Sequence, residues 1–238
     1  MAVTGVAALS LVLVPGQPAA ADSLSEAQLR EALLDAVDFP EGWAADSERS
    51  ARERGFGVPE PTEPDCSGLF GSPPEDGGDE GTAWAGFART RSGPFVTTVA
   101  TAHADAAAAR SAVESAREAL DGACATIHTR EGAGERGVTV AYDAAALELK
   151  QAASFGEEAV AVRFQRRLDG EVATTPVVAD LVIARVGAQT VRIAQAGRDD
   201  GSTGEVTEIA ERAVEKLRQV AEGRTPAPSP DQPGTTDL

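Results

Sequence analysis

Basic residues are scarce in this sequence of 238 residues. Lysine and arginine number 21 against 38 aspartate and glutamate residues, so the formal net charge is 21 − 38 = −17. Nucleic-acid binding needs a basic face for the phosphates, and binding to an anionic membrane surface needs clustered lysine and arginine. The charge balance therefore argues against both kinds of partner.

Aromatic residues are also few, at 4% of the chain. Hydrophobic residues of all kinds make up 42%, which is enough for a packed core and argues against global disorder. Alanine, valine and leucine must therefore form most of that core. The length fits one sizeable domain or two small ones.

The motifs that mark common active sites are missing. The two histidines, His103 and His128, form neither H-x-x-x-H nor H-E-x-x-H, so the sequence has no zinc-hydrolase signature. G-x-S-x-G and the G-x-x-x-x-G-K-[S/T] and G-x-G-x-x-G phosphate loops do not occur either. The stretch EGAGERG at 131–137 is predicted to be a flexible loop and not a nucleotide cradle, because no strand is expected directly before it.

Two pairs of acidic residues remain as candidates for acid–base chemistry. Asp35 and Asp38 lie at a predicted helix end, and Asp199 and Asp200 lie in a predicted loop. Carboxylates at such places are usually solvated. The sequence from Asp199 onward also lacks the full twelve-residue calcium-loop pattern. The sequence therefore predicts no enzyme activity, no metal site and no cofactor.

Long apolar runs are absent. The longest candidate, Val6–Val14, would rise about 14 Å as a helix, far short of a hydrocarbon core of roughly 30 Å, so no membrane span is expected. Ala19–Ala21 provides the small residues that a signal peptidase requires. We expect residues 1–21 to be a secretory signal peptide; the alternative is an apolar N-terminal strand of a cytoplasmic protein. No cysteine precedes Cys66, so no lipid anchor is expected, and the predicted location is secreted or extracytoplasmic.

Cysteine occurs only twice, at Cys66 and Cys124. An even count in an exported chain indicates a disulfide, and the spacing matches no redox or zinc motif. A bridge closing so long a loop would stabilise the fold by roughly 4 kcal/mol. The alternative is two unrelated buried thiols.

The pattern of apolar residues predicts an α+β fold. We expect an antiparallel, twisted β-sheet with helices packed mainly on one face, and a ββα unit that occurs twice as a pseudo-repeat, at 82–120 and 177–221. The alternative to a repeat is coincidence, since ββα units are common. We predict one domain over residues 22–222 and a disordered, proline-rich tail over 223–238. The expected helices cover 24–37, 104–120 and 204–221, and the expected strands cover 82–90, 95–101, 158–167, 177–186 and 189–195.

Arginines on the predicted strands are the strongest candidates for a binding site. If the helices cover the other face of the sheet, Arg163 and Arg185, with Trp84 nearby, line an open cleft suited to an anionic or carbonyl-bearing ligand. The alternative is a solvated sheet face with cross-strand ion pairs.

The order of several short motifs resembles one known family. The sequence DFPEGW at 38–43, Cys66 before a glycine-rich loop, GTAWAGF at 81–87, the helix over 111–120 followed by Cys124, and the hairpin ADLVIARVGAQTVRIA at 179–194 are similar to the PknH-like extracellular sensor domains of actinobacteria. The resemblance covers roughly residues 25–221. It implies a disulfide-stabilised fold that binds ligands in a large cleft. Family members often carry two disulfides, whereas only one is possible here, and the sequence has no kinase domain.

Three functions compete at this stage. The leading hypothesis is an exported, non-enzymatic ligand-binding or sensor-like domain of the bacterial cell envelope, whose partner is an unidentified small molecule or envelope component. The second is a secreted protein-interaction module of the envelope. The third is a secreted hydrolase, which would need a convergent set of acid and base groups.

Overall fold

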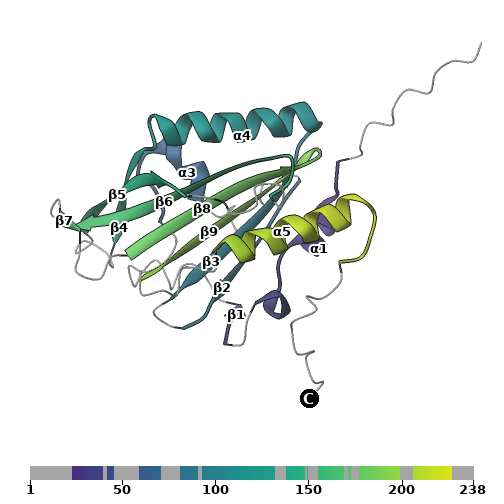
Figure 1. Ribbon diagram of the computed structural model, residues 1–238, viewed down its shortest axis with the longest axis horizontal. Coiled ribbons are helices and arrows are strands. Elements are labelled where there is room, and N and C mark those ends of the chain that lie inside the picture. Colours follow the sequence, from purple (N-terminus) through teal and green to yellow (C-terminus); the bar gives the residue numbers. More distant parts are fainter. Residues whose placement is uncertain are drawn as a thin grey trace, which may run out of the picture.

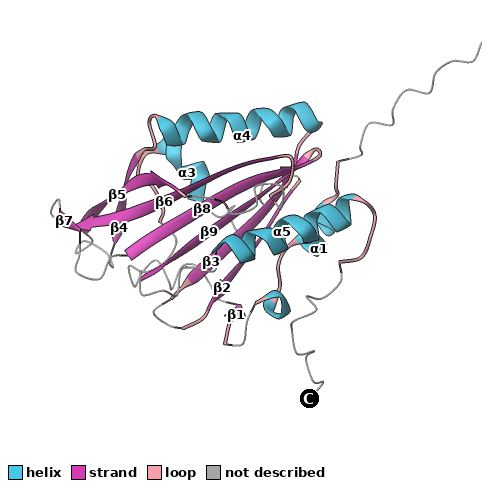
Figure 2. Ribbon diagram, in the orientation of Figure 1, coloured by secondary structure: helices cyan, strands magenta, loops and turns pink. Residues whose placement is uncertain are grey.

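The computed structural model describes residues 23–39, 42–45, 59–70, 81–90, 93–131, 138–147, 149, 155–168, 171–172, 177–198 and 206–226. The described residues form one antiparallel β-sheet with α-helices packed against it, so the α+β prediction is confirmed (Figure 1; Figure 2). The predicted signal peptide over 1–21 lies outside the described residues, as does most of the predicted tail.

The helices are α1 (Glu26–Ala32), the short 3₁₀ helix η1 (Ala36–Asp38), α3 (Pro64–Phe70), α4 (Ala106–Asp121) and α5 (Val206–Ala221). The strands are β1 (Ala44–Ala45), β2 (Thr82–Ala88), β3 (Phe95–Ala102), β4 (Thr126–Glu131), β5 (Val138–Ala146), β6 (Glu158–Leu168), β7 (Glu171–Val172), β8 (Val177–Val186) and β9 (Gln189–Arg198).

The strands within the described residues follow the order β1-β2-β3-β9-β8-β6-β5-β4, and β7 pairs with β6. The two predicted hairpins, β2–β3 and β8–β9, therefore lie side by side, joined where β3 pairs with β9. The tight turn between β8 and β9 uses Gly187, whose φ is 60°, a backbone conformation that glycine adopts without steric cost.

Helices cover both faces of this sheet, so the prediction that they lie mainly on one face is wrong. Strand β8 is buried along its whole length because its two sets of alternating side chains enter different cores. Leu181 and Ile183 pack with Val113 of α4, whereas Val182 and Ala184 pack with Leu217 of α5. A strand that is apolar on both faces, such as VVADLVIARV, requires cover on both sides.

The core on the α5 face joins the two ends of the domain. Helix α5 buries one stripe against β8 and β9, and α1 packs against α5 beside β2 and β3 (Figure 1). A capping box formed by Ser25 and Gln28 starts α1. Helix α1 is shorter than predicted, because Leu33 is already extended and Asp35 then caps η1.

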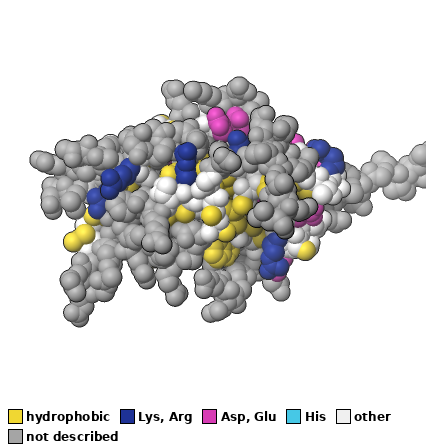
Figure 3. Space-filling model, turned by 90° about the horizontal axis from the view of Figure 1, so that it is seen from below, with side chains coloured by type: hydrophobic (Ala, Val, Ile, Leu, Met, Phe, Trp, Pro, Cys, Tyr) yellow, Lys and Arg dark blue, Asp and Glu magenta, His cyan; other side chains and the backbone are white. Residues whose placement is uncertain are grey.

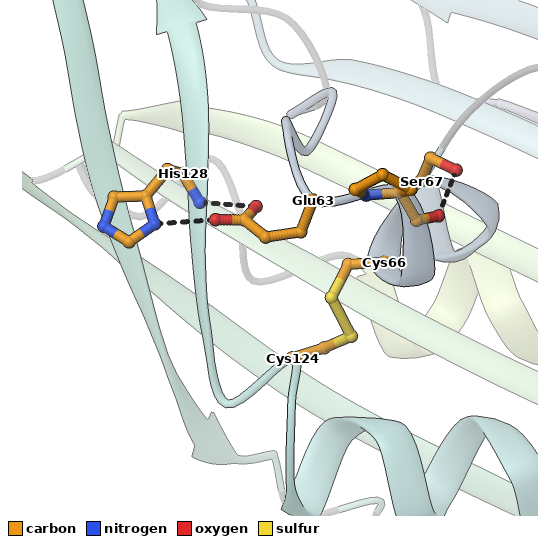
Figure 4. The surroundings of a disulfide bond; sticks show 6 residues. Glu63, Cys66, Ser67, Cys124 and His128 are labelled. Atoms are coloured by element: carbon orange, nitrogen blue, oxygen red, sulfur yellow. Dashed lines mark hydrogen bonds and ion pairs between the residues drawn. A yellow bond between two sulfur atoms is a disulfide. The ribbon is translucent and has the colours of Figure 1, made fainter.

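The core on the α4 face contains the disulfide. Cys66 on α3 and Cys124, just after α4, are bridged at an S–S distance of 2.03 Å, which confirms the predicted bridge (Figure 4). Both cysteines are buried beside Leu120 and Ile127. The bridge thus fastens α3 to the end of α4.

Strands β4 and β5 were not expected from the sequence. Strand β4 has the sequence TIHTRE and β5 begins with VTVAY, so both contain β-branched residues, a strand signal that the prediction did not use. The statement that no strand directly precedes the glycine-rich stretch 131–137 is therefore wrong. The order of the two predicted ββα units is confirmed, but α4 and α5 lie on opposite faces of the sheet, so the second unit does not copy the first.

Helix α4 begins with an N-cap that allows a direct test of the fold. The side chain of Asp105 accepts a hydrogen bond of 2.8 Å from the backbone N–H of Ala108. We expect Asp105→Ala to lower the free energy of unfolding by about 1 kcal/mol in urea denaturation, because a backbone donor loses its acceptor. Asp105→Asn, which keeps the acceptor, should remain close to the parent protein. Equal losses in both variants would contradict the capping role.

Candidate functional site: a cleft between α1 and α5

The structure does not bring the three predicted cleft residues together. Arg163 on β6 pairs in register with Asp180, whereas Arg185 lies five residues further along β8, so the two arginines point to opposite faces of the sheet. Arg163 lies on the face of the sheet that α5 covers. Arg185 and Trp84 both lie on the face that α4 covers, but strands β3 and β9 separate them. The predicted cleft at this position is therefore wrong. Side-chain alternation within each strand was interpreted correctly, but the register between strands could not be obtained from it.

Both arginines are also neutralised within the fold. Arg163 donates two hydrogen bonds of 2.7 Å to Asp180, a residue with no exposed surface. The Arg185 side chain is 6% exposed and lies 3.6 Å from the carboxylates of both Glu157 and Glu158. These contacts match the alternative of cross-strand ion pairs and leave neither guanidinium to hold a ligand by charge.

The two histidines lie in different places. His103 follows β3, and its Nε2 lies 2.9 Å from the hydroxyl of Thr190. Burial lowers the pKa of His103 below its usual value, which keeps the ring neutral. A histidine beside a threonine hydroxyl could act as a general base, but no carboxylate is hydrogen-bonded to His103 in the described part of the chain.

His128 on β4 is held by Glu63, next to the disulfide (Figure 4). One carboxylate oxygen of Glu63 lies 2.7 Å from Nδ1 of His128, and the other accepts a 3.1 Å bond from the backbone N–H of His128. Partial burial opposes ionisation of Glu63, but the hydrogen bonds from the backbone and ring of His128 prevail and lower the pKa of Glu63. The backbone N–H of Thr62 donates to the carbonyl of His128 at 2.7 Å. These contacts fasten the segment before α3 to the edge strand β4.

Metal binding has no structural support within the described residues, where no group of three or more His, Cys, Asp or Glu side chains could hold an ion. None of the helices in this part of the chain has a stretch long and apolar enough to cross a membrane.

A cleft of about 280 Å³ lies between the α1–η1 segment and the C-terminal half of α5. Its third wall is the chain just after α5, at Thr225 and Pro226. Chain segments from both ends of the domain therefore meet at this cleft. Besides Thr225, the lining combines four apolar residues with five charged ones: Leu33, Leu34, Val37, Pro226, Arg30, Glu31, Asp35, Asp38 and Lys216.

A buried ion pair forms the floor of the cleft. The ammonium of Lys216 on α5 donates to Oδ2 of Asp38 at 2.6 Å and to Oδ2 of Asp35 at 3.2 Å. Asp38 is 5% exposed, and its carboxylate also accepts from the backbone N–H of Asp35 at 2.8 Å. Arg212 of α5 donates to the carbonyl oxygen of Asp38. Charged contacts thus hold η1 against α5 and give the cleft a defined shape.

The sequence pointed to Asp35 and Asp38 as a pair but placed both in solvent. For Asp38 that expectation is wrong, because it is buried against α5. Its partner Lys216 lies 178 residues further along the chain and is one of only two lysines. The signal that could have found the pair is a lysine on the border of the apolar stripe of α5, where only a carboxylate could accompany its partial burial.

No family model matches the chain, and no curated protein sequence matches it either. Its fold is similar to a solved extracellular domain. One similar structure is the extracellular domain of PknH from Mycobacterium tuberculosis, with a TM-score of 0.50 and 17% sequence identity over 83% of this chain and 98% of that one. At this identity the likeness concerns the fold alone, and at that level the resemblance noted in the sequence is confirmed.

Figure 3 shows the charged and hydrophobic side chains of the described residues on one face of the molecule. Seen from below, hydrophobic side chains of the described residues gather near the middle, and the lysine and arginine side chains lie apart from one another (Figure 3). A phosphate backbone is recognised by clustered basic groups. On this face the described basic residues do not form such a cluster.

Proposed function

We propose that this protein is an extracytoplasmic, non-enzymatic ligand-binding module of the sensor-like kind, whose ligand occupies the cleft between α1 and α5. The observation that carries the proposal is the cleft itself, with apolar walls, charged groups fixed by hydrogen bonds, and a volume near the lower end of the range for small-molecule sites. The likeness in fold to an extracellular domain and the disulfide support the location.

The arrangement of the cleft suits a sensor-like role. Its walls come from the first helix, the last helix and the chain that leaves the last helix. A ligand that contacts all three would stabilise the packing of α1 and η1 on α5. Binding would then be transmitted to both segments by which the domain joins the rest of the chain, because a ligand favours the conformation it binds best.

The experiment is a thermal-shift screen with small amines, carboxylates and saccharide fragments. A true ligand at a hundred times its Kd stabilises the protein by about 2.7 kcal/mol, which raises Tm by roughly 5–10 °C for a domain of this size. We expect Val37→Trp, which fills the cleft from η1, to abolish the shift. Val138→Trp is the matched control, because Val138 is 52% exposed on β5, away from the cleft.

Two outcomes would contradict the proposal. If the Val37→Trp variant keeps the full shift, the ligand binds elsewhere. If no small molecule binds, but a purified envelope protein forms a complex that survives Val37→Trp, the protein is an interaction module and the cleft is incidental.

A further inference from the structure

We infer that the cleft between α1 and α5 selects a ligand that carries a positively charged amine on a short alkyl chain. The inference rests on the proposed use of the cleft and adds the chemical class of the ligand. The argument compares the basic residues at the cleft, which are already paired, with the acidic residues there, which outnumber them.

Neither basic residue at the cleft has charge to spare for an anion. Lys216 is shared between two carboxylates, Asp35 and Asp38, and its side chain is only 12% exposed. Arg30 is paired with Glu26, one helical turn earlier on α1, and both of these side chains are largely exposed. An anionic ligand would therefore have to break existing ion pairs in order to bind.

The acidic residues at the cleft outnumber the available positive charges. The ammonium of Lys216 donates to both Asp35 and Asp38, so these three side chains together carry a net charge of −1. Glu31 also faces the cleft and has neither a hydrogen bond nor an ion pair with any described residue. The lining residues together carry a net charge of −1, and Glu26 beside the cleft balances the charge of Arg30. The chain's formal charge of −17 adds a long-range potential of the same sign, which raises the local concentration of cations.

The apolar part of the lining defines the rest of the ligand. Leu33, Leu34 and Val37 stand on the α1–η1 side, and Pro226 stands on the opposite wall. A cavity of about 280 Å³ is large enough for a short alkyl chain with its head group. A free alkylamine and the side chain of a lysine in an envelope peptide share this chemistry.

The test compares three probes of equal chain length: pentylamine, pentan-1-ol and pentanoate. Binding to the full protein is followed by NMR chemical-shift changes, with Val37→Trp as the blocked cleft. We expect pentylamine to bind at least fivefold more tightly than the alcohol and the acid to bind most weakly, with the preference for the amine shrinking as salt is added. A fourth probe, N-acetyl-lysine methylamide, distinguishes a free alkylamine from a lysine side chain in a peptide. If the natural ligand is a peptide, this probe should bind more tightly than pentylamine.

Charge variants at Glu31 complete the test. Glu31→Gln should weaken pentylamine two- to fivefold and Glu31→Lys more strongly, whereas Glu114→Lys on the exposed side of α4 should leave binding unchanged. Tighter binding of the acid, equal binding of the alcohol, or indifference to Glu31→Lys would overturn the inference, while loss of binding in Val37→Trp would still support the cleft as a ligand site. Failure of all three probes at tens of millimolar would also overturn it, and the proposed function would then depend on the wider screen alone.

Discussion

Replacing both cysteines with alanine is expected to lower the free energy of unfolding by roughly 4 kcal/mol. The bridge joins residues separated by 58 positions and so lowers the conformational entropy of the unfolded chain. Without the bridge the unfolded chain regains this entropy and is favoured. The loss would be a large part of the 5–15 kcal/mol that stabilises a typical domain. Urea denaturation of Cys66→Ala/Cys124→Ala, followed by circular dichroism, measures it.

The loss should be concentrated at α3. This helix has seven residues, too few to persist in isolation, and it is held by the bridge, by the buried Leu69 and Phe70, and by the clamp between Glu63 and His128. Hydrogen exchange in the double variant should therefore rise at α3 before it rises at α5.

Ser67→Ala on the same helix is the control, since Ser67 is exposed and its hydroxyl donates to the carbonyl of Pro64, three residues earlier. Stability losses below about 1 kcal/mol in the cysteine variant, or equal to that of Ser67→Ala, would refute a structural role for the bridge.

Removing the charge of Arg163 is expected to cost about 3–5 kcal/mol. Asp180 has no exposed surface, and Arg163 meets it with two hydrogen bonds of 2.7 Å. Without the guanidinium, the buried carboxylate loses its bidentate cationic partner, which costs more than losing the pair as a whole. Chemical denaturation of Arg163→Met measures the effect.

Two further variants separate this explanation from a simple loss of side-chain packing. Arg163→Met/Asp180→Leu removes both charges and should recover most of the stability. Arg167→Met breaks the pair of Arg167 with Asp143, whose side chains are 49% and 26% exposed, and should cost less than about 1 kcal/mol. Equal losses in Arg163→Met and Arg167→Met would show that burial of Asp180 does not matter.

Most of the central elements could be predicted because their local pattern agrees with their surroundings. Strands β3, β8 and β9 are rich in β-branched residues, and α5 carries an unbroken apolar stripe. The outer strands β4 and β5 were not predicted, although both contain β-branched residues. Their place in the sheet depends on the pairing of β5 with β6 and of β4 with β5, and no local sequence pattern reveals that pairing.

The sequence by itself determined the α+β class, the central strands and helices, the disulfide and the strongly acidic surface, since these depend on composition, periodicity and the count of cysteines. Only the tertiary structure decided where the charges act. The register between β6 and β8 placed Arg163 and Arg185 on opposite faces, because a shift of an odd number of residues reverses every side chain. The packing of α1 against α5 brought Asp38 to Lys216 and created the cleft, since burial of a charge requires a partner that no local sequence pattern can reveal.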